Sequence, residues 1–392
     1  MESPSKPLRG IRVLELARTL AGPWMGQLLA DMGADVVKIE RSEVGDETRV
    51  WGPPFVQSDG GESIFSAYFQ ACNRGKRSVE ADFSNPDDRA LVRRLIANAD
   101  IVVENFRVGT LARYQLDAKS MMRDNPRLVW CSISGFGQTG PYAQRAAYDF
   151  VIQAMSGLMA LNGTEEAGPR SIPLPVSDLF TGLYGAIAVL AALNRRHETG
   201  LGTVVDLSLL DTQVSAMSQD IIGHLLGRHQ TAARRESDLV PKVLLQTADA
   251  QIALVIASDL QFARLIEAMG CSALADDERF KTNELRLAHL ADLLEELTAI
   301  FRNCASNEVI TRLADFGVPV GRVNSLSELT SDPHIAQREL ITEAPPLKGC
   351  KNVPPSVRMP ALFNGQAALP ETPAPRLGEH TNEVRSDPRW GA

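Results

Sequence analysis

The chain has 392 residues, of which 44% are hydrophobic and 22% are charged. These fractions are typical of folded globular proteins and exclude extended disorder, and the length predicts about two domains. The formal net charge of -8 argues against a nucleic acid or an anionic membrane surface as the main partner.

The five cysteines are scattered and show no CxxC or Cys/His spacing, so we expect free thiols and no metal site. The first residues contain no apolar core of a signal peptide. The most apolar stretch, Leu179 to Leu193, is shorter than the roughly 18 apolar residues that a helix needs to span a bilayer. We therefore expect a cytoplasmic protein without a membrane segment.

The N-terminal 40 residues have the pattern of a β-α-β unit. Residues 11–16 are predicted as a strand, Gly22-Pro23 opens a helix that ends at Gly33, and residues 35–40 are predicted as a second strand. Such a unit predicts a parallel sheet with ligands bound at the carboxyl ends of its strands. The turn lacks a GxGxxG motif, which argues against a nicotinamide or flavin site.

Further strands follow with polar or glycine-rich ends. Residues 76–82 and 101–105 are predicted as strands, with a helix beginning at Asn85 between them. Residues 128–134 form another predicted strand, followed by a glycine-rich loop at 135–141. Because ligands bind where parallel strands end, Glu104, Asn105 and this loop are candidate ligand contacts.

Asp178 stands at the predicted start of a helix that runs to about Arg196. The preceding prolines keep the approach extended, and small residues lie on one face of the helix. Asp178 could cap the helix, or it could be a carboxylate nucleophile beside backbone N–H groups that stabilise an oxyanion. Gly182 and Gly185 fit either close helix packing or room for a substrate. Local sequence does not separate these alternatives.

The remaining chain divides at a polar, basic segment. Residues 204–209 are predicted as a strand, and Gly227 to Lys242 resembles a linker. A smaller unit follows, with a strand pair around Asp249 and then helices that carry Phe262, Leu290 and Ile310 in turn. From Pro345 many prolines predict an extended tail that runs over a surface.

A series of short motifs runs in order along almost the whole chain. They are residues 10–16, Ala21-Gly22-Pro23, residues 28–40, 73–78, 103–106, 125–129, 135–142, Tyr148-Asp149, Ser177-Asp178, 199–202 and 377–381. These motifs resemble the class III CoA-transferases, a family that includes formyl-CoA and carnitine CoA-transferases, and α-methylacyl-CoA racemases share its fold.

The resemblance implies an α/β fold with a large doubly wound, Rossmann-like domain and a small α+β domain. Two chains would thread through each other as an interlocked homodimer. We place the N-terminal part of the large, CoA-binding domain at residues 1–222, a linker at 223–242, the small domain at 243–323, and a segment that returns to the large domain at 324–392.

The resemblance also implies the chemistry. Asp178 matches the family's nucleophile, which attacks an acyl-CoA to give an acyl-aspartyl anhydride and then an aspartyl-CoA thioester. The substrates would be an acyl-CoA and a carboxylic acid, with no tightly bound cofactor.

Family positions that contact CoA or substrate match a further set of residues. They are Leu20, Ala21, Arg41, Ala81, Asp82, Phe83, Ser84, Asn105, Phe106, Arg107, Arg113, Ala146, Ala147, Tyr148 and Asp149. Ser84 and Ala146 stand where formyl-CoA transferase has lysines, so contacts there must differ. The glycine run that covers the aspartate in that enzyme is also missing, so its acyl specificity is not carried over.

Two other functions remain as alternatives. A racemase needs a second base opposite the aspartate, and its Gly-His-Asp motif is replaced here by Ala147-Tyr148-Asp149. Because a phenol is a poor base at neutral pH, this favours a transferase. The other alternative is a catalytically idle CoA-binding protein.

Overall fold

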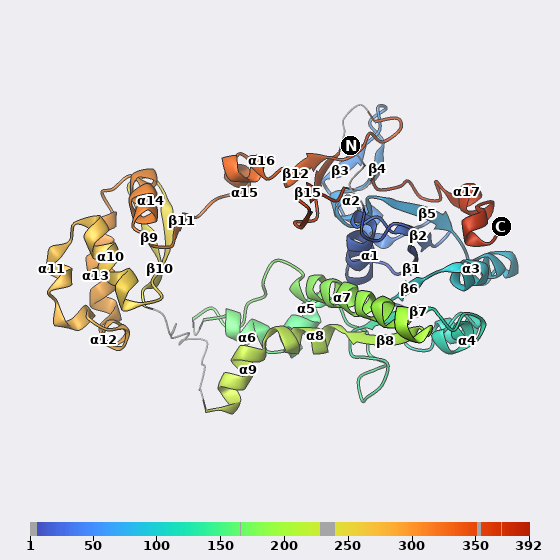
Figure 1. The fold of residues 1–392 in the computed structure, drawn as a ribbon, viewed down its shortest axis with the longest axis horizontal. Coiled ribbons are helices and arrows are strands. Elements are labelled where there is room, and N and C mark those ends of the chain that lie inside the picture. Colours follow the sequence, from blue (N-terminus) through green and yellow to red (C-terminus); the bar gives the residue numbers. More distant parts are fainter. Residues whose placement is uncertain (1–5, 165, 228–239, 351–353, 370) are drawn as a thin grey trace. The chain divides into compact units, whose positions relative to one another are not determined.

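The computed structural model describes residues 6–392 except 165, 228–239, 351–353 and 370 (Figure 1). The chain forms two compact units, one from Met1–Ala233 and Arg338–Ala392 and the other from Arg234–Gln337. The smaller unit predicted at 243–323 lies inside the second of these. Most of the predicted linker at Gly227 to Lys242 falls outside the described residues.

A six-stranded parallel sheet organises the first unit. Its strands are β1 (Arg12–Leu16), β2 (Asp35–Glu40), β5 (Lys76–Glu80), β6 (Ile101–Glu104), β7 (Val129–Ser134) and β8 (Thr203–Ser208). Their order is β5-β2-β1-β6-β7-β8, and every neighbouring pair is parallel. This is the order of doubly wound sheets, in which a crevice opens between β1 and β6. The predicted parallel α/β sheet is confirmed.

Helices cover both faces of this sheet because successive strand residues point to opposite sides. Helices α1 (Ala21–Asp31) and α7 (Val176–Thr199) pack together on one face, where Val13 and Val103 belong to their core (Figure 1). Helices α3 (Pro86–Asn98), α4 (Ala118–Asp124) and α17 (Thr381–Arg385) cover the other face, where Leu14 is buried.

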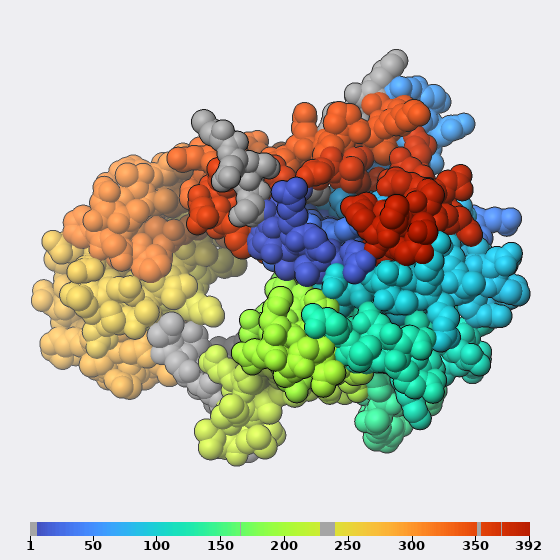
Figure 2. All heavy atoms as spheres, turned by 45° about the vertical axis from the view of Figure 1, so that its right-hand side comes forward, coloured from blue at the N-terminus to red at the C-terminus, as the bar shows by residue number. Residues whose placement is uncertain are grey.

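The C-terminal segment belongs to the first unit. Arg77 on β5 lies 3.0 Å from Asp387, and Arg385 lies 2.6 Å from Asp88. The red C-terminal residues accordingly lie against the cyan segment that contains α3 (Figure 2). The proline-rich tail before them contains two short antiparallel pairs, β12 (Ile341–Glu343) with β13 (Pro355–Val357), and β14 (Leu362–Phe363) with β15 (Gln366–Ala367).

Other elements of the first unit were not predicted from the sequence. They are η1 (Glu47–Val50), β3 (Phe55–Gln57), β4 (Ser63–Ser66), α2 (Ala67–Asn73), η2 (Leu111–Tyr114), α5 (Asp149–Met155), α6 (Leu158–Asn162), α8 (Leu209–Ala216), α9 (Ser218–Leu225) and η4 (Pro388–Trp390).

The second unit has its own antiparallel sheet and core. Strands β9 (Lys242–Gln246), β10 (Gln251–Val255) and β11 (Val320–Arg322) pair in the order β11-β10-β9, which confirms the strand pair around Asp249. The helices are α10 (Asp259–Met269), α11 (Ser272–Ala275), η3 (Glu278–Phe280), α12 (Asn283–Ala288), α13 (Leu290–Phe301) and α14 (Ser306–Asp315), followed by α15 (Leu326–Thr330) and α16 (Pro333–Gln337).

Helix α7 is longer than the sequence analysis assumed. With 24 residues it is the one helix, among the described residues, that is long and apolar enough to cross a membrane by length and composition alone. Val189 and Leu193 on one of its faces are buried in the core with α1. Part of its apolar composition is therefore explained by packing inside the first unit.

Candidate active site

Asp178 is the third residue of α7 and does not cap it. The N-cap is Pro175, so the capping alternative for Asp178 is wrong. The carboxylate that accepts the free N–H groups at the start of α7 belongs instead to Asp149, the first residue of α5, which lies far from α7 in the sequence. Its Oδ1 accepts the backbone N–H of Ser177 at 2.7 Å and that of Asp178 at 3.4 Å. The Asp178 carboxylate is thus free to face elsewhere.

Asp149 is fixed by a second buried polar group. Gln153 Nε2 donates to Asp149 Oδ2 at 2.6 Å, and Gln153 Oε1 accepts the N–H of Ile172 at 2.9 Å. These bonds join α5 to the extended approach of α7. They place the Asp149 charge next to the first turn that carries Asp178.

The surroundings of Asp178 disfavour its charged form. Burial raises the pKa of its carboxyl, and the negative charge of Asp149 raises it further, to about 7. The backbone N–H of Ala21, the first residue of α1, lies near the carboxylate and acts in the opposite direction, because it favours the charged form. A carboxyl with this pKa, facing a cavity, is a candidate reactive group.

Two glycines allow α7 to lie close to α1. A Cβ at Gly182 would lie 2.9 Å from the carbonyl oxygen of Ala21, and a Cβ at Gly185 would lie 2.8 Å from Met25 Sδ. Both glycines therefore serve close packing, the first of the two alternatives left open by the sequence. At Gly182 this contact also brings the start of α1 to Asp178.

Asp178 lines a cavity of about 200 Å³ at the carboxyl ends of the strands. Loops after β1, β6 and β7 form its walls, as expected for a doubly wound sheet. The lining includes nine of the residues singled out from the sequence: Leu20, Ala21, Asn105, Phe106, Arg107, Ala146, Ala147, Tyr148 and Asp178.

A neighbouring cavity of about 350 Å³ contains a second group of these residues. Its lining includes Arg41, Ala81, Asp82, Phe83 and Phe106. Arg18 and Phe106 line both cavities, so the two are adjacent.

Three of the residues that match family positions line neither cavity. Asp149 is buried and caps α7. Arg113 lies on η2, between Thr110 and Tyr114, which both line the second cavity. Ser84 is exposed in the turn before α3.

Two arginines that the sequence analysis did not single out also line the first cavity. Arg18 and Arg145 lie there with Arg107, and all three side chains are exposed. Within the described ranges none of them forms an ion pair, and Arg145 stacks over the ring of Tyr142 at 3.9 Å. These cations remain available to anionic ligands.

Tyr68 was also missed. It lies on α2, and burial, together with the nearby Cys72 and Asp178, raises the pKa of its hydroxyl. The ring of Trp51 packs edge-on against it, with 5.5 Å between the ring centroids. Both residues come from the stretch between β2 and β5, where no periodic pattern marked them.

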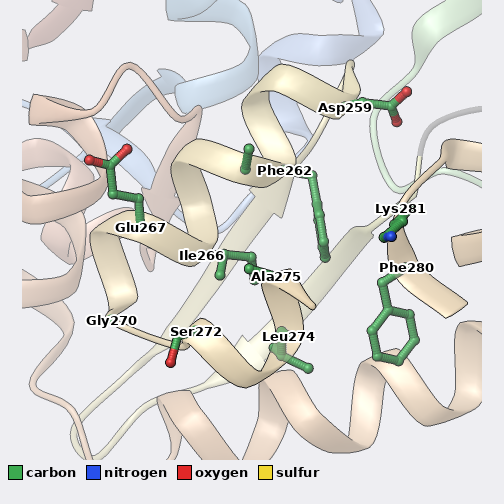
Figure 3. Close-up of a pocket in the computed structure, with 11 residues that line it drawn as sticks. Asp259, Phe262, Ile266, Glu267, Gly270, Ser272, Leu274, Ala275, Phe280 and Lys281 are labelled. Carbon is green, nitrogen blue, oxygen red and sulfur yellow. The ribbon is translucent and has the colours of Figure 1, made fainter. Parts of the chain in front are cut away.

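The second unit contains a separate cavity of about 430 Å³ between α10, α11 and η3 (Figure 3). Its apolar lining includes Phe262, Leu274 and Phe280. The charged groups Asp259 and Lys281 are engaged in ion pairs with side chains of the same unit. Across the described part of the chain, no group of three or more His, Cys, Asp or Glu residues could hold a metal ion.

Comparison with known proteins identifies the family. A family model described as CoA-transferase family III matches residues 8–381. The chain belongs to this family.

Relatives of this CoA-transferase are similar over almost their whole length. A succinate–glutarate CoA-transferase of Agrobacterium fabrum is 42% identical over 389 residues, which cover 99% of this chain and 97% of the relative. A succinyl-CoA–D-citramalate CoA-transferase of Chloroflexus aurantiacus is 35% identical and covers 98% and 95%. The crystal structure of a CAIB/BAIF family protein from Brucella suis superposes with a TM-score of 0.85 at 41% identity, covering 97% of this chain and 98% of that one.

The resemblance stated from the motifs is confirmed. The protein is a CoA-transferase, an enzyme whose substrates are CoA thioesters, and its mixed α/β fold with a large parallel sheet is that of the Brucella suis structure.

Proposed function

We propose that the enzyme transfers CoA from an acyl-CoA to a carboxylic acid through covalent intermediates on Asp178. The observation that carries this proposal is the position of the Asp178 carboxylate. It lines the cavity at the sheet's carboxyl edge, lies near the N–H of Ala21 at the start of α1, and has a pKa raised to about 7.

The reaction would proceed by four exchanges at carbonyl carbons. An Asp178 oxygen attacks the thioester carbonyl, the C–S bond breaks, and CoA leaves as a thiolate. The thiolate then attacks Cγ of Asp178, which releases the first acid and leaves an aspartyl-CoA thioester. The acceptor carboxylate attacks the same Cγ and expels the thiolate, giving a new anhydride. Attack of the thiolate on the acceptor's acyl carbon frees the Asp178 carboxylate.

The site is suited to these steps because it is partly desolvated. Burial removes water that would stabilise the Asp178 carboxylate, so its basicity is raised toward that of a useful nucleophile. The Ala21 N–H can donate to the oxyanion that forms when Cγ of Asp178 is attacked. We infer that bound substrates exclude the water that would otherwise hydrolyse the intermediates.

The neighbouring cavity would hold the nucleotide end of CoA. Arg41 offers a cation for phosphate, and Phe83 and Phe106 offer aromatic surface. The family positions Arg107 and Arg113 would supply further cations.

We propose dicarboxylic acids as the substrate class. The relatives are named for succinate and glutarate and for succinyl-CoA and D-citramalate. A second carboxylate needs a cationic partner when it is buried with the first. Arg18 and Arg145, exposed in the cavity of Asp178, are available for it.

The racemase alternative finds no support at the same site. The residue before Asp149 is Tyr148, and none of the side chains that line the Asp178 cavity is a histidine. The second base that inversion requires is thus not supplied by those side chains. The idle-protein alternative is decided by experiment.

The test is covalent trapping with succinyl-CoA. We expect the quenched wild-type enzyme to carry a label at Asp178 by intact mass and peptide mapping, and hydroxylamine to release it. Asp178→Asn should carry no label, and its transfer rate should fall by about 10³-fold or more. Undiminished transfer by Asp178→Asn would overturn the proposal. Exchange of the α-proton in deuterated water without CoA transfer would favour a racemase, and neither reaction in the wild type would favour an idle protein.

We also propose that the enzyme is an interlocked homodimer. A second copy would cover a stripe of exposed apolar side chains on α7, namely Phe180, Leu183, Tyr184 and Ile187. Their spacing of i, i+3, i+4 and i+7 places them on one face of the helix. Such a face on a soluble protein marks an interaction surface.

A further inference from the structure

Four buried charged side chains lie next to the loop that leads to α1. They are Glu15 on β1, Lys38 on β2, Asp46 after β2 and Lys76 on β5. Lys38 Nζ lies 3.0 Å from Glu15 Oε1 and 2.9 Å from Asp46 Oδ2, and Lys76 Nζ lies 2.7 Å from Glu15 Oε2. Two positive charges thus balance two negative ones inside the protein.

Both ammonium groups also hold the main chain of residues 17–23, which comprise the connection after β1 and the first three residues of α1 and are called the loop 17–23 below. Lys38 Nζ donates to the carbonyl oxygen of Ala17 at 2.6 Å, and Lys76 Nζ donates to that of Pro23 at 2.8 Å. These two carbonyls stand at the two ends of the loop. A hydrogen bond from a buried ammonium is stronger than one between neutral groups, so both ends are firmly held.

The middle of the loop is held by carboxylates. The backbone N–H of Thr19 donates to Asp46 at 3.2 Å, and Thr19 Oγ1 donates to Glu47 at 2.9 Å. Thr19 has a φ of 71°, a left-handed conformation that is unfavourable for a β-branched residue. Such a conformation persists only where the surroundings impose it, and it stands two residues before Ala21.

Gly26 on α1 leaves room for two of the buried charged groups. A Cβ at Gly26 would lie 1.9 Å from Glu15 Oε2 and 3.2 Å from Lys76 Nζ, so no larger residue fits there without displacing this pair. Buried ion pairs contribute little net stability compared with apolar residues of similar volume. What this group does supply is a fixed location for the loop.

We propose that Lys38, Asp46, Glu15 and Lys76 are positioning residues for catalysis. They fix the loop 17–23 so that the Ala21 N–H stays directed at the Asp178 carboxylate. None of them reacts with the substrate. The proposal rests on the proposed nucleophilic role of Asp178.

The test uses a charge-balanced double variant, Lys38→Met with Asp46→Asn. It removes one positive and one negative charge together, which avoids leaving an uncompensated buried charge. It frees the Ala17 carbonyl and weakens the hold on Thr19. We expect the single-turnover rate of Asp178 labelling by succinyl-CoA to fall about 10-fold or more, because a small displacement of an oriented donor is costly. Lys38 and Asp46 also line the cavity proposed for the nucleotide end of CoA, so the Kd for succinyl-CoA should change as well. This change should be smaller than the change in labelling rate, since a lost orientation affects the reacting state more than binding.

A matched control is Arg196→Met with Asp100→Asn. Arg196 lies near the end of α7, and Asp100 directly precedes β6; Arg196 Nη1 is 3.2 Å from Asp100 Oδ1. The pair stands at the amino end of β6, and neither residue lines the Asp178 cavity. We expect it to lower the Tm as much as the first double variant does while leaving the labelling rate within about 2-fold of wild type. Equal losses of rate in both double variants would show a purely structural role and overturn the inference.

Thr19→Gly decides the question if the double variant does not fold. It keeps all four charges and relieves the strain at φ 71°, so we expect an unchanged Tm and a slower labelling rate. An unchanged labelling rate in a folded variant would overturn the inference. If the wild type carries no label, the proposed role of Asp178 fails instead, so the two failures are distinguishable.

Discussion

The negative charge of Asp149 acts on Asp178 across the first turn of α7. Its Oδ1 lies 2.7 Å from the backbone nitrogen of Ser177, and together with burial its charge raises the pKa of Asp178 to about 7. A large fraction of the nucleophile is therefore protonated at neutral pH. Only the ionised carboxylate can attack a thioester, so the rate depends on this equilibrium.

The first prediction concerns pH. We expect kcat/KM of the wild type to rise as pH increases through about 7. Asp149→Asn removes a charge that disfavours ionisation, so the pKa of Asp178 falls and the midpoint of the rise moves to lower pH by roughly 1 unit. Initial rates between about pH 5 and pH 9 measure this midpoint.

Asp87→Asn is the control for a general loss of charge, because Asp87 also lies in the first turn of a helix, α3, but is exposed on the other face of the sheet. It should leave the midpoint unchanged. An Asp149→Asn enzyme with the wild-type midpoint would show that Asp149 does not control the ionisation of Asp178.

The second prediction concerns stability. The folded protein holds the Asp178 proton more tightly than the unfolded chain, whose carboxyl has the ordinary pKa of 3.8. The bound proton therefore adds to the free energy of unfolding. This contribution is fully present below pH 3.8 and is lost as pH rises through about 7. Asp178→Asn removes this loss, so we expect its Tm to exceed that of the wild type by roughly 2–5 °C at pH 8. Calorimetry at pH 8 and again near pH 4 should show that the difference disappears in acid. A Tm below wild type at pH 8 would contradict it.

At the level of helices, the approach of α1 to α7 decides where the Ala21 N–H lies. The contact is backbone to backbone at Gly182, where an added Cβ would lie 2.9 Å from the Ala21 carbonyl oxygen and 3.2 Å from the Met25 nitrogen. Main-chain atoms cannot rotate away as side chains can. A larger residue must therefore displace the start of α1.

The third prediction is that Gly182→Ala lowers kcat by about 10-fold or more, with a smaller change in KM, because α1 and its N–H move away from Asp178. Gly185→Ala, one turn along the same helix, is the matched control. Its Cβ would meet the flexible Met25 side chain, at 2.8 Å from Sδ, so we expect a nearly normal kcat. Steady-state kinetics of the two variants give the comparison, and equal kcat values would exclude a special role for the Gly182 contact.

Regular elements of the first unit could be predicted because their signals are local. Residues 35–40 form β2 with the predicted bounds, and α3 begins directly after the predicted Asn85, whose side chain accepts the N–H of Asp87 at 2.8 Å. Runs of buried apolar residues and capping side chains carry this information within a few positions.

Features formed by distant residues could not be predicted in the same way. The cap of α7 comes from Asp149, in an earlier helix, so the sequence around Asp178 gave no sign of it. Glu15 and Lys38 are direct partners across β1 and β2, yet their burial depends on Asp46 and Lys76 as well. Which cavity a loop residue lines likewise depends on how several loops come together.

At the scale of the whole molecule, the exposed apolar side chains of α7 and α9 are typical of an interaction surface. Ile187 on α7 is 63% exposed, and on and after α9 Ile222 is 55%, Leu225 76% and Leu226 83% exposed. Clustered side chains of this kind are costly in water. A second copy of the chain, as the family resemblance implies, would bury them. The cytoplasmic location stays a prediction.

The last prediction separates an interlocked dimer from two subunits that only lie side by side. Light scattering should give a mass of twice the 42.6 kDa chain. Two preparations of the dimer, each with a different tag, should form no mixed dimers when they are mixed as folded proteins, because threaded chains cannot part without unfolding. After joint denaturation and refolding, mixed dimers should form. Ile187→Glu places a charge in the proposed interface and should lower the Tm, since it weakens the contact between the two chains that stabilises the folded dimer, whereas Leu201→Glu, at an exposed site after α7, should not. Exchange between folded dimers would exclude interlocking while leaving the dimer itself, and a monomeric wild type would exclude both.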